Sequence, residues 1–223
     1  MSTTRLMTAA TMGVVALLLT GCGSASPGVA AKVGDDVLTV RDIDTATSHY
    51  CTAVGEQFES PVAMRYVRQY VVQLLALRSQ AEQLADEYGV KAGSTYQNDV
   101  AQEQGTARTL PEEVRDDYVR LTSTPAYAQD IVDQVGRIVL DEQGIADPTT
   151  DQVTQAGLDV FNQWPDANGV EVDPRYGLSN VDGVLKPVDT DTSVAVGEIA
   201  KTGQAENPDP AFAETLPTTH RCG

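Results

Sequence analysis

The residues with the most distinctive chemistry lie near the start of the chain, where a cysteine follows a leucine and two small residues. A single basic residue, Arg5, precedes an apolar run from Met7 to Leu19, which leads into Leu19-Thr20-Gly21-Cys22. This order is typical of a secretory signal peptide with a bacterial lipobox at its cleavage site. We therefore expect residues 1–21 to be removed and the Cys22 thiol to carry lipid.

The alternative is an ordinary transmembrane helix followed by an incidental cysteine. The apolar run is shorter than the roughly 20 residues that a helix needs to cross a bilayer. Two or three acyl chains on Cys22 would bury many methylene groups at about 0.8 kcal/mol each, so attachment would be effectively permanent. The sequence thus predicts a membrane-anchored protein on the extracytoplasmic face, with residues 22–28 as a short tether.

Two further cysteines, Cys51 and Cys222, follow Cys22 in the chain. Oxidising compartments favour disulfides, so outside the cytoplasm we expect these two thiols to pair. The bond would close a loop of roughly 170 residues, a constraint worth up to about 5 kcal/mol in the loop-entropy model. Two unpaired or separately modified thiols remain the alternative, because a sequence does not show whether two sulfurs meet.

Residues that could bind a metal or form a nucleophile–base pair are few and scattered. His49 lies two positions before Cys51, a spacing that places the two side chains on different helix faces, and His220 lies in a polar segment. A zinc site or a Cys–His pair would need partners from far along the chain. We expect no metal site, no cofactor and no catalytic residues.

Two groups of carboxylates also attract attention. Asp189 and Asp191 resemble the start of a calcium loop, but Ala200 occupies the position of the bidentate glutamate. Glu112-Glu113 and Asp116-Asp117 lie near an expected helix start, where the helix dipole favours negative charge. We therefore assign the first group to a solvated loop and the second to helix capping rather than to acid–base catalysis.

The composition excludes one large class of partners. The chain has 15 basic and 32 acidic residues and a formal net charge of −17, and loss of Arg5 with the signal peptide would make it one unit more negative. Nucleic-acid binding depends on clustered lysine and arginine, so we expect none. Only 5% of the residues are aromatic, which argues against a stacking platform for sugars or bases.

The elements that would position these residues begin with a hairpin. Residues 29–33 and 37–40 alternate in strand fashion around Gly34-Asp35-Asp36. Thr39 and Asp42 have the spacing of a capping pair, which predicts a helix from about Arg41.

A long helix is predicted next, opened by Ser60-Pro61 and stopped by Gly89. Its apolar residues follow alternating steps of four and three, the spacing of a heptad seam. Val71 and Leu75 widen this face, which favours packing in a bundle. The seam consists of Ala63, Val67, Tyr70, Leu74, Leu77, Ala81, Leu84 and Tyr88.

Further helices are predicted over 93–104, from about 109 to 121, over 127–143 and from 147 to 164, with a loop at 122–125. After them, residues 169–174 predict a short strand and 184–188 a second, edge strand, because Pro187 lacks a backbone donor. Beyond Val196 the chain is acidic and rich in proline, so residues 197–223 are predicted to be a disordered tail. The expected fold class is mainly α, with one domain over 29–196 and a small N-terminal hairpin.

This order of elements resembles the chaperone module of the SurA, PrsA and trigger-factor group. The likeness rests on residues 29–44, similar to the group's opening strand, turn, strand and capped helix, and on Tyr88-Gly89-Val90 at the end of the long helix. Residues 170–177, which begin Val-Glu-Val-Asp-Pro, are similar to the strand that returns to the opening hairpin. Relatives of the PrsA and SurA kind carry a parvulin isomerase domain before that strand, and residues 144–169 are too few to hold one.

The resemblance implies a lipid-anchored chaperone-like module without isomerase activity. Our leading expectation is a holdase that shields non-native or secreted polypeptides in an apolar groove beside the long helix. The alternative is a structural or adaptor lipoprotein that binds one specific folded envelope partner. A third hypothesis, an enzyme site built from scattered acids around Arg175 and Tyr176, has less support.

Overall fold

The computed structural model describes residues 27–188, 197–203 and 209–223. The predicted signal peptide, the lipobox with Cys22 and nearly all of the tether lie outside these residues, as do Asp189 and Asp191. The helices are α1 (Val40–Val54), α2 (Met64–Tyr88), α3 (Ser94–Ala107), α4 (Arg115–Thr122), α5 (Thr124–Glu142), α6 (Thr150–Asn168), α7 (Glu198–Gly203) and α8 (Pro210–Thr215). Short 3-10 turns lie at Gly55–Gln57, Glu112–Val114, Pro174–Tyr176 and Thr218–His220. The strands are β1 (Val29–Val33), β2 (Asp36–Thr39), β3 (Val62–Ala63), β4 (Val170–Val172), β5 (Leu178–Val181), β6 (Val184–Pro187) and β7 (Arg221–Cys222).

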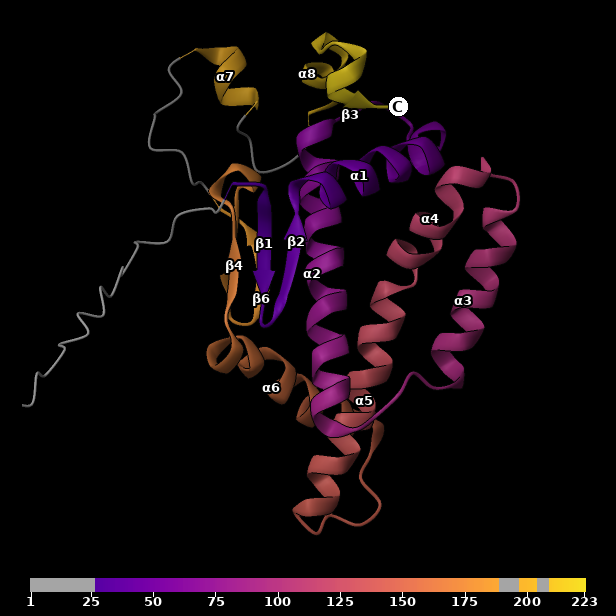
Figure 1. The fold of residues 1–223 in the computed structure, drawn as a ribbon, viewed down its shortest axis with the longest axis vertical. Helices are drawn as coiled ribbons and strands as arrows, with labels where there is room; N and C mark the ends of the chain where they lie inside the picture. The colour runs from indigo at the N-terminus through magenta and orange to yellow at the C-terminus, as the bar shows by residue number, and fades with distance from the viewer. Residues whose placement is uncertain (1–26, 189–196, 204–208) are drawn as a thin grey trace, which may run out of the picture.

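A small antiparallel sheet joins the two ends of the helical region (Figure 1). Its order is β2-β1-β4, so the late strand β4 returns to the opening hairpin and pairs Val172 with Ala31 and Val170 with Val33. At the end of the hairpin, the Thr39 hydroxyl accepts from the Asp42 amide while the Asp42 carboxylate accepts from the Thr39 amide, which forms a capping box. The predicted hairpin, capped helix and returning strand are confirmed.

The long helix α2 lies at the centre of the domain, and several other elements pack around it. Its buried residues cover a wide face rather than a narrow seam, and Tyr70, predicted in the seam, is 45% exposed. Glutamines along α2 donate to backbone carbonyls of other elements, which fixes the later strands, the hairpin and α6 on it. These bonds join Gln69 to Tyr176 at 2.8 Å, Gln73 to Leu185 at 2.8 Å, Gln80 to Phe161 at 2.7 Å and Gln83 to Val33 at 2.7 Å.

The start of α2 differs from its prediction, whereas its end agrees. Residues Val62–Ala63 are extended and pair with β7, so the helix begins at Met64 rather than behind Ser60-Pro61. This distant strand pairing overrides the local helix-start signal. At the other end Gly89 has a φ of 65°, a left-handed conformation that glycine adopts without strain.

Two boundaries between the later helices were wrong in the prediction. Instead of a loop at 122–125, only Ser123 separates α4 from α5, and its backbone is itself helical with φ −85° and ψ −4°. The last long helix begins at Thr150, where Thr149 and Gln152 form a capping box, and it continues through Pro165 to Asn168. The capping box at Thr149 therefore sets the start of this helix, whereas the prediction had placed the start at Asp147-Pro148.

The C-terminal segment is not the disordered tail that its composition predicted. Residues 209–223 form α8, a 3-10 turn and β7. Strand β7 pairs with β3, which directly precedes α2 in the sequence. Ala213 of α8 is 1% exposed and Cys222 is 0% exposed, so this acidic segment contributes buried groups to the domain. In Figure 1 it lies at the same end of the molecule as α1.

The structure is mainly helical, with a small N-terminal hairpin and C-terminal strands, so the predicted fold class is confirmed. The core gathers around α2, with α5 and α6 on one side and the sheet on another, and its largest fully buried side chains include Ile43, Leu84, Leu121 and Ile131.

Candidate functional site

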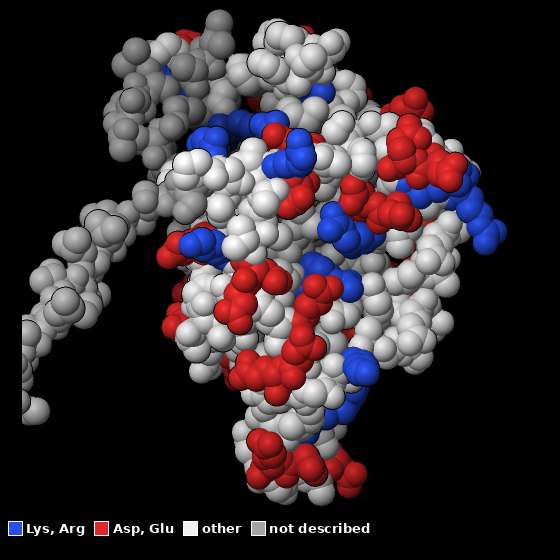
Figure 2. Space-filling view, in the orientation of Figure 1, with Lys and Arg blue, Asp and Glu red and all other residues white. Residues whose placement is uncertain are grey.

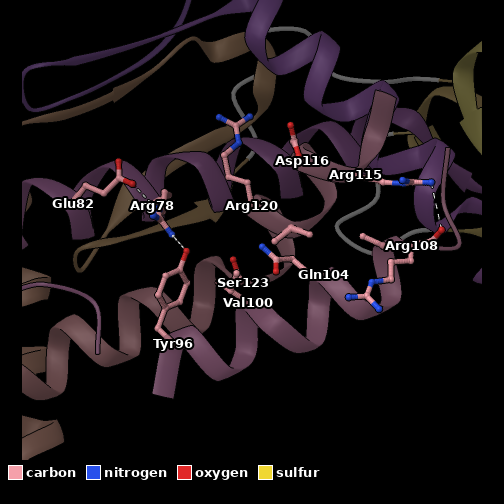
Figure 3. A pocket seen from close by; sticks show the side chains of 12 residues that line it. Arg78, Glu82, Tyr96, Val100, Gln104, Arg108, Arg115, Asp116, Arg120 and Ser123 are labelled. Carbon is pink, nitrogen blue, oxygen red and sulfur yellow. Dashed lines mark hydrogen bonds and ion pairs between the residues drawn. The ribbon is translucent and has the colours of Figure 1, made fainter. Parts of the chain in front are cut away.

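The described residues form an open cleft between α2, α3 and α4, with a volume of about 410 Å³ (Figure 3). Helix α3 supplies one wall through Tyr96, Val100 and Gln104, and α4 supplies another. The cleft combines an apolar lining with charged groups at its rim, the composition usual for sites that bind organic ligands or peptide side chains. The remaining lining residues are Arg78, Glu82, Ala107, Arg108, Arg115, Asp116, Val119, Arg120 and Ser123.

At one end of the cleft, Arg78 is held firmly in place. Its guanidinium donates to Glu82 and, at 2.9 Å, to the Tyr96 hydroxyl, and it lies 3.7 Å from the centre of the Tyr127 ring. Burial alone would lower the pKa of Arg78, but the hydrogen bonds that it donates to Glu82 and Tyr96 outweigh this effect and raise the pKa above its ordinary value. Arg78 is therefore a fixed cation that links α2 to α3 and α5.

On the α4 side, Arg120 belongs to a chain of side-chain contacts that reaches α1. Its guanidinium lies 2.7 Å from Asp117 Oδ1, and the other oxygen of Asp117 lies 2.6 Å from His49 Nδ1. Through this contact His49 ties α1 to α4. Among the described residues no group of three metal-ligating side chains occurs.

At the other end of the cleft, Arg108 and Arg115 have no carboxylate partner within 4.0 Å among the described residues. Arg115 donates to the backbone carbonyls of Leu110 at 2.9 Å and Arg108 at 3.4 Å. These bonds orient the Arg115 side chain but leave its charge without a neutralising partner. Figure 3 shows Arg108 and Arg115 together at one end of the cleft, away from Arg78.

Ser123, in the middle of the cleft in Figure 3, has a buried hydroxyl without a hydrogen-bond partner in the described structure. The residue is 0% exposed. Its neighbours behave differently: the Thr122 hydroxyl donates to the Tyr118 carbonyl and the Thr124 hydroxyl to the Arg120 carbonyl, both at 2.8 Å. A buried polar group without a partner is unfavourable, so Ser123 is an exception that needs an explanation.

The positive charge of the cleft contrasts with the acidic character of the whole chain. Four arginines line the cleft and three carboxylates lie in or beside it, namely Glu82, Asp116 and Asp117. The whole chain has more than twice as many acidic as basic residues. Figure 2 shows acidic groups spread over the drawn face and a group of basic side chains between α2 and α4. The cleft is thus a local exception to the negative charge of the molecule.

Two other hollows lie elsewhere on the described surface. One of about 140 Å³ is bounded by α2, α6 and the β5–β6 hairpin and is mostly apolar, and Asn180 Oδ1 in its wall has no hydrogen-bond partner in the described structure. The other, of about 510 Å³, is a shallow hollow beside Cys51, Phe58 and Gly223. Neither combines apolar walls with unpaired cations as the α2–α3–α4 cleft does.

Few large apolar side chains are exposed among the described residues. The large hydrophobic side chains that are exposed in the described structure lie on different elements: Val37 on β2, Tyr70 on α2, Ile145 after α5 and Val184 on β6. Isolated apolar residues of this kind are normal on a soluble surface, whereas a binding patch for many unfolded chains requires continuity.

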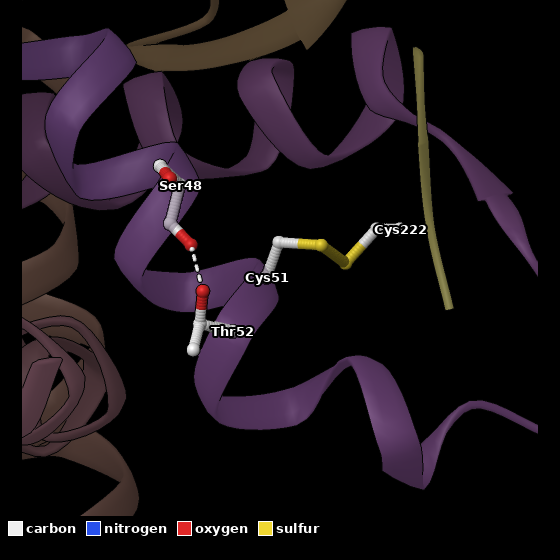
Figure 4. Close-up of a disulfide and its surroundings, with 4 residues drawn as sticks. All are labelled: Ser48, Cys51, Thr52 and Cys222. Carbon is white, nitrogen blue, oxygen red and sulfur yellow. Dashed lines mark hydrogen bonds between the residues drawn. A yellow bond between two sulfur atoms is a disulfide. The ribbon is translucent and has the colours of Figure 1, made fainter. Parts of the chain in front are cut away.

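The structure joins Cys51 of α1 to Cys222 of β7 in a disulfide, with their Cα atoms 5.5 Å apart (Figure 4). In the turn of α1 beside the bond, the Thr52 hydroxyl donates to the Ser48 carbonyl at 2.9 Å. His220 lies in the 3-10 turn just before β7 and is exposed. The disulfide therefore fixes the C-terminal segment against α1.

The other residues singled out from the sequence take structural positions. Glu112 and Glu113 lie in the 3-10 turn before α4, and Asp116 in its first turn. Asp173 pairs with Arg175 at 2.7 Å, and the Tyr176 side chain is buried in the core. The hydrogen bond from Arg175 lowers the pKa of Asp173, and burial raises that of Tyr176.

Sequence reasoning did not predict the cleft. Its arginines are widely spaced in the chain, and only the packing of α2, α3 and α4 around one cleft brings them to its rim. The four serine and threonine residues at 122–124 and 106 carry no pattern that marks one hydroxyl as unpaired. No local signal in the sequence would have identified Ser123.

Fold and cleft together define a mainly α-helical domain with a small closing sheet and an arginine-lined cleft. No family model, curated protein or solved structure matches the chain. Within the described residues, no helix has both the length and the apolar character required to cross a bilayer.

Proposed function

We propose that the protein is a lipid-anchored adaptor of the bacterial envelope that binds a segment of one polypeptide partner in the α2–α3–α4 cleft. The lipobox at Cys22 supports the anchor. The observation that carries the binding role is the cleft itself, which offers about 410 Å³ of space and fixed charged groups. The proposal needs no metal, cofactor or catalytic step, and it places no nucleic acid among the partners.

Selectivity follows from the shape and charge of this surface. Oriented groups such as Arg78 and Arg115 bind most tightly to a partner whose atoms match their positions. A mismatched partner binds more weakly, because it leaves charges desolvated without a compensating contact. The scattered exposed hydrophobic residues add little non-specific attraction. These features favour one partner over a broad set of unfolded clients.

The second candidate function is a holdase for secreted polypeptides. It is favoured by the β2-β1-β4 sheet and the capped helix behind it, the arrangement for which the sequence resembles the SurA group. This support is an analogy of fold, and a fold hosts many functions. The apolar groove that a holdase needs is not formed by the exposed hydrophobic residues of the described surface.

Crosslinking in living cells separates the two functions. A photo-crosslinking amino acid replaces Val100 in the cleft of the full chain, and a matched control carries it at Ile145, which is 38% exposed and outside the cleft. The adaptor predicts one dominant polypeptide product from position 100 and none from position 145. Many secreted proteins from position 100 would support the holdase, and no product from position 100 would contradict both functions.

A further inference from the structure

The unpaired groups of the cleft indicate what kind of segment it accepts. Arg108 and Arg115 lack carboxylate partners in the described structure, and Ser123 has a buried hydroxyl without an acceptor. Two cations without a carboxylate partner and one donor without an acceptor therefore lie along a single cleft. A ligand that satisfies all of them must supply anionic groups and at least one further acceptor oxygen.

We propose that the cleft binds an acidic polypeptide segment, whose Asp or Glu side chains pair with Arg108 and Arg115 while a backbone carbonyl accepts from Ser123. The inference rests on the proposed polypeptide-binding function and names the chemistry of the partner. Arginine suits this role because its planar guanidinium forms two parallel hydrogen bonds to one carboxylate. The apolar walls at Val100 and Val119 accommodate the aliphatic parts of the segment.

Charge complementarity selects an acidic occupant over other segments. Arg78 is already neutralised by Glu82 and Arg120 by Asp117, so the free positive charge lies at the Arg108–Arg115 end. A basic segment would meet these two uncompensated cations. The acidic surface elsewhere repels acidic chains, which confines their binding to the cleft.

The proposed contact with Ser123 requires one wall of the cleft to shift, and we assign this shift to the part of α3 beyond Tyr96. Ser123 is fully enclosed, so a ligand oxygen reaches its hydroxyl only when the neighbouring wall shifts. Ala107, at the end of α3, is the buried residue of that helix, which makes α3 a lightly packed element beside the well-buried α2 and α5. Elements that bury little apolar surface open at low cost in free energy.

Peptide binding to the full chain in detergent tests the proposal. The probe is an acetylated, amidated pentapeptide, Leu-Glu-Val-Glu-Leu, and the control peptide has glutamine at both acidic positions. We expect the acidic peptide to bind at least about tenfold more tightly, with an affinity that falls as salt rises. Equal affinities, or no binding of the acidic peptide, would overturn the proposal.

Variants locate the binding. Arg108→Gln with Arg115→Gln should remove the preference for the acidic peptide, whereas Arg137→Gln, at an exposed position of α5 outside the cleft, should retain it. Ser123→Ala should weaken binding of both peptides and yet raise the melting temperature, because it removes an unpaired buried hydroxyl. A purely structural Ser123 would instead lower the melting temperature and leave the peptide affinities unchanged.

Two further ligands test whether the carboxylate that binds comes from a side chain, from a chain terminus or from a fatty acid. Binding of the glutamine peptide only when its C-terminus is free would assign the site to a chain terminus, and tighter binding of dodecanoate than of the acidic peptide would assign it to a lipid. Either result overturns the acidic segment. If the acidic peptide fails while the crosslink from position 100 succeeds, the adaptor function stands and this inference fails.

Discussion

Tyr50, on α1, is partly buried against α2, and its ring centre lies 5.7 Å from that of Tyr70. Burial is the main reason that the pKa of Tyr50 rises from 10.0 to about 12, and the neighbouring tyrosines Tyr70 and Tyr118 add to the shift. The phenol must therefore remain protonated in the folded protein at a pH where an unfolded chain would ionise it.

This shift predicts a loss of stability at high pH. Because the folded pKa is raised, the contribution of Tyr50 is fully present below pH 10.0 and disappears as the pH rises towards about 12. Two pKa units would correspond to about 3 kcal/mol for a fully buried phenol, and solvent screening makes the contribution of the partly buried Tyr50 to the free energy of unfolding smaller than this. Tyr50→Phe should therefore unfold at neutral pH much as the wild type does and lose less stability in alkali, as measured by denaturant titration. Identical alkaline losses in the two proteins would contradict the shift.

At the residue scale, the sequence predicted what depends on near neighbours. The Thr39–Asp42 capping box is confirmed because its partners are three residues apart and the bonds form wherever a helix starts. The raised pKa of Tyr50 depends on groups that folding packs around its side chain. The unpaired hydroxyl of Ser123 arises because folding buries it without placing an acceptor beside it. No sequence pattern encodes either property.

At the scale of elements, helices α5 and α6 touch through glycine. A Cβ atom built on Gly157 of α6 would lie 2.0 Å from the Val132 carbonyl oxygen, and one on Gly136 of α5 would lie 2.0 Å from the Val153 carbonyl oxygen. These distances leave no room for a side chain, so the two helices pack backbone to backbone. Gly157 is buried in α6, and the predicted helix did not reveal why this position must be a glycine.

Alanine at this contact should be strongly destabilising. Gly157→Ala forces the helices apart and should lower the free energy of unfolding by about 1 to 3 kcal/mol or more. The matched control is Gly105→Ala in α3, where a Cβ meets no atom within 4 Å. This control should gain about 0.5 to 1 kcal/mol from helix propensity. Thermal melting of both variants checks the pair, and a neutral Gly157→Ala would show that the α5–α6 contact is wrong.

The predictions of element boundaries were wrong where contacts with distant parts of the chain determine the boundary. The start of α2 shifted to Met64 because Val62–Ala63 pairs with β7, which lies more than 150 residues further along the chain. The C-terminal segment is ordered because α8 and β7 pack against that same region, although its composition favours disorder. Where local pattern decides, as in the hairpin and in the capped start of α1, the prediction agreed with the structure.

At the scale of the whole molecule, one covalent bond joins segments that are 171 residues apart. The Cys51–Cys222 disulfide connects α1 with the last strand and so closes nearly the entire domain into a loop. The sequence predicted this pairing from the expected compartment and the number of cysteines, not from contacts. The position of the bond, between α1 and a strand beside α2, could not be predicted.

Removal of this bond should loosen the molecule. Cys51→Ser combined with Cys222→Ser should lower the free energy of unfolding by up to about 5 kcal/mol, because the unfolded chain regains the entropy of an open loop. Hydrogen exchange should accelerate first in α8 and β7, which the bond fixes against α1. If denaturant unfolding is unchanged with or without a reducing agent, the disulfide is absent from the folded protein.

The expected compartment underlies the oxidised cysteines, the display of the cleft and the adaptor function. The most direct measurement of it is the mass of the N-terminal peptide from the protein made in bacterial cells. We predict a chain that begins at Cys22, bears acyl chains on its sulfur and fractionates with the membrane. An intact chain that begins at Met1, with a free Cys22 thiol and in the soluble cell interior, would contradict the account.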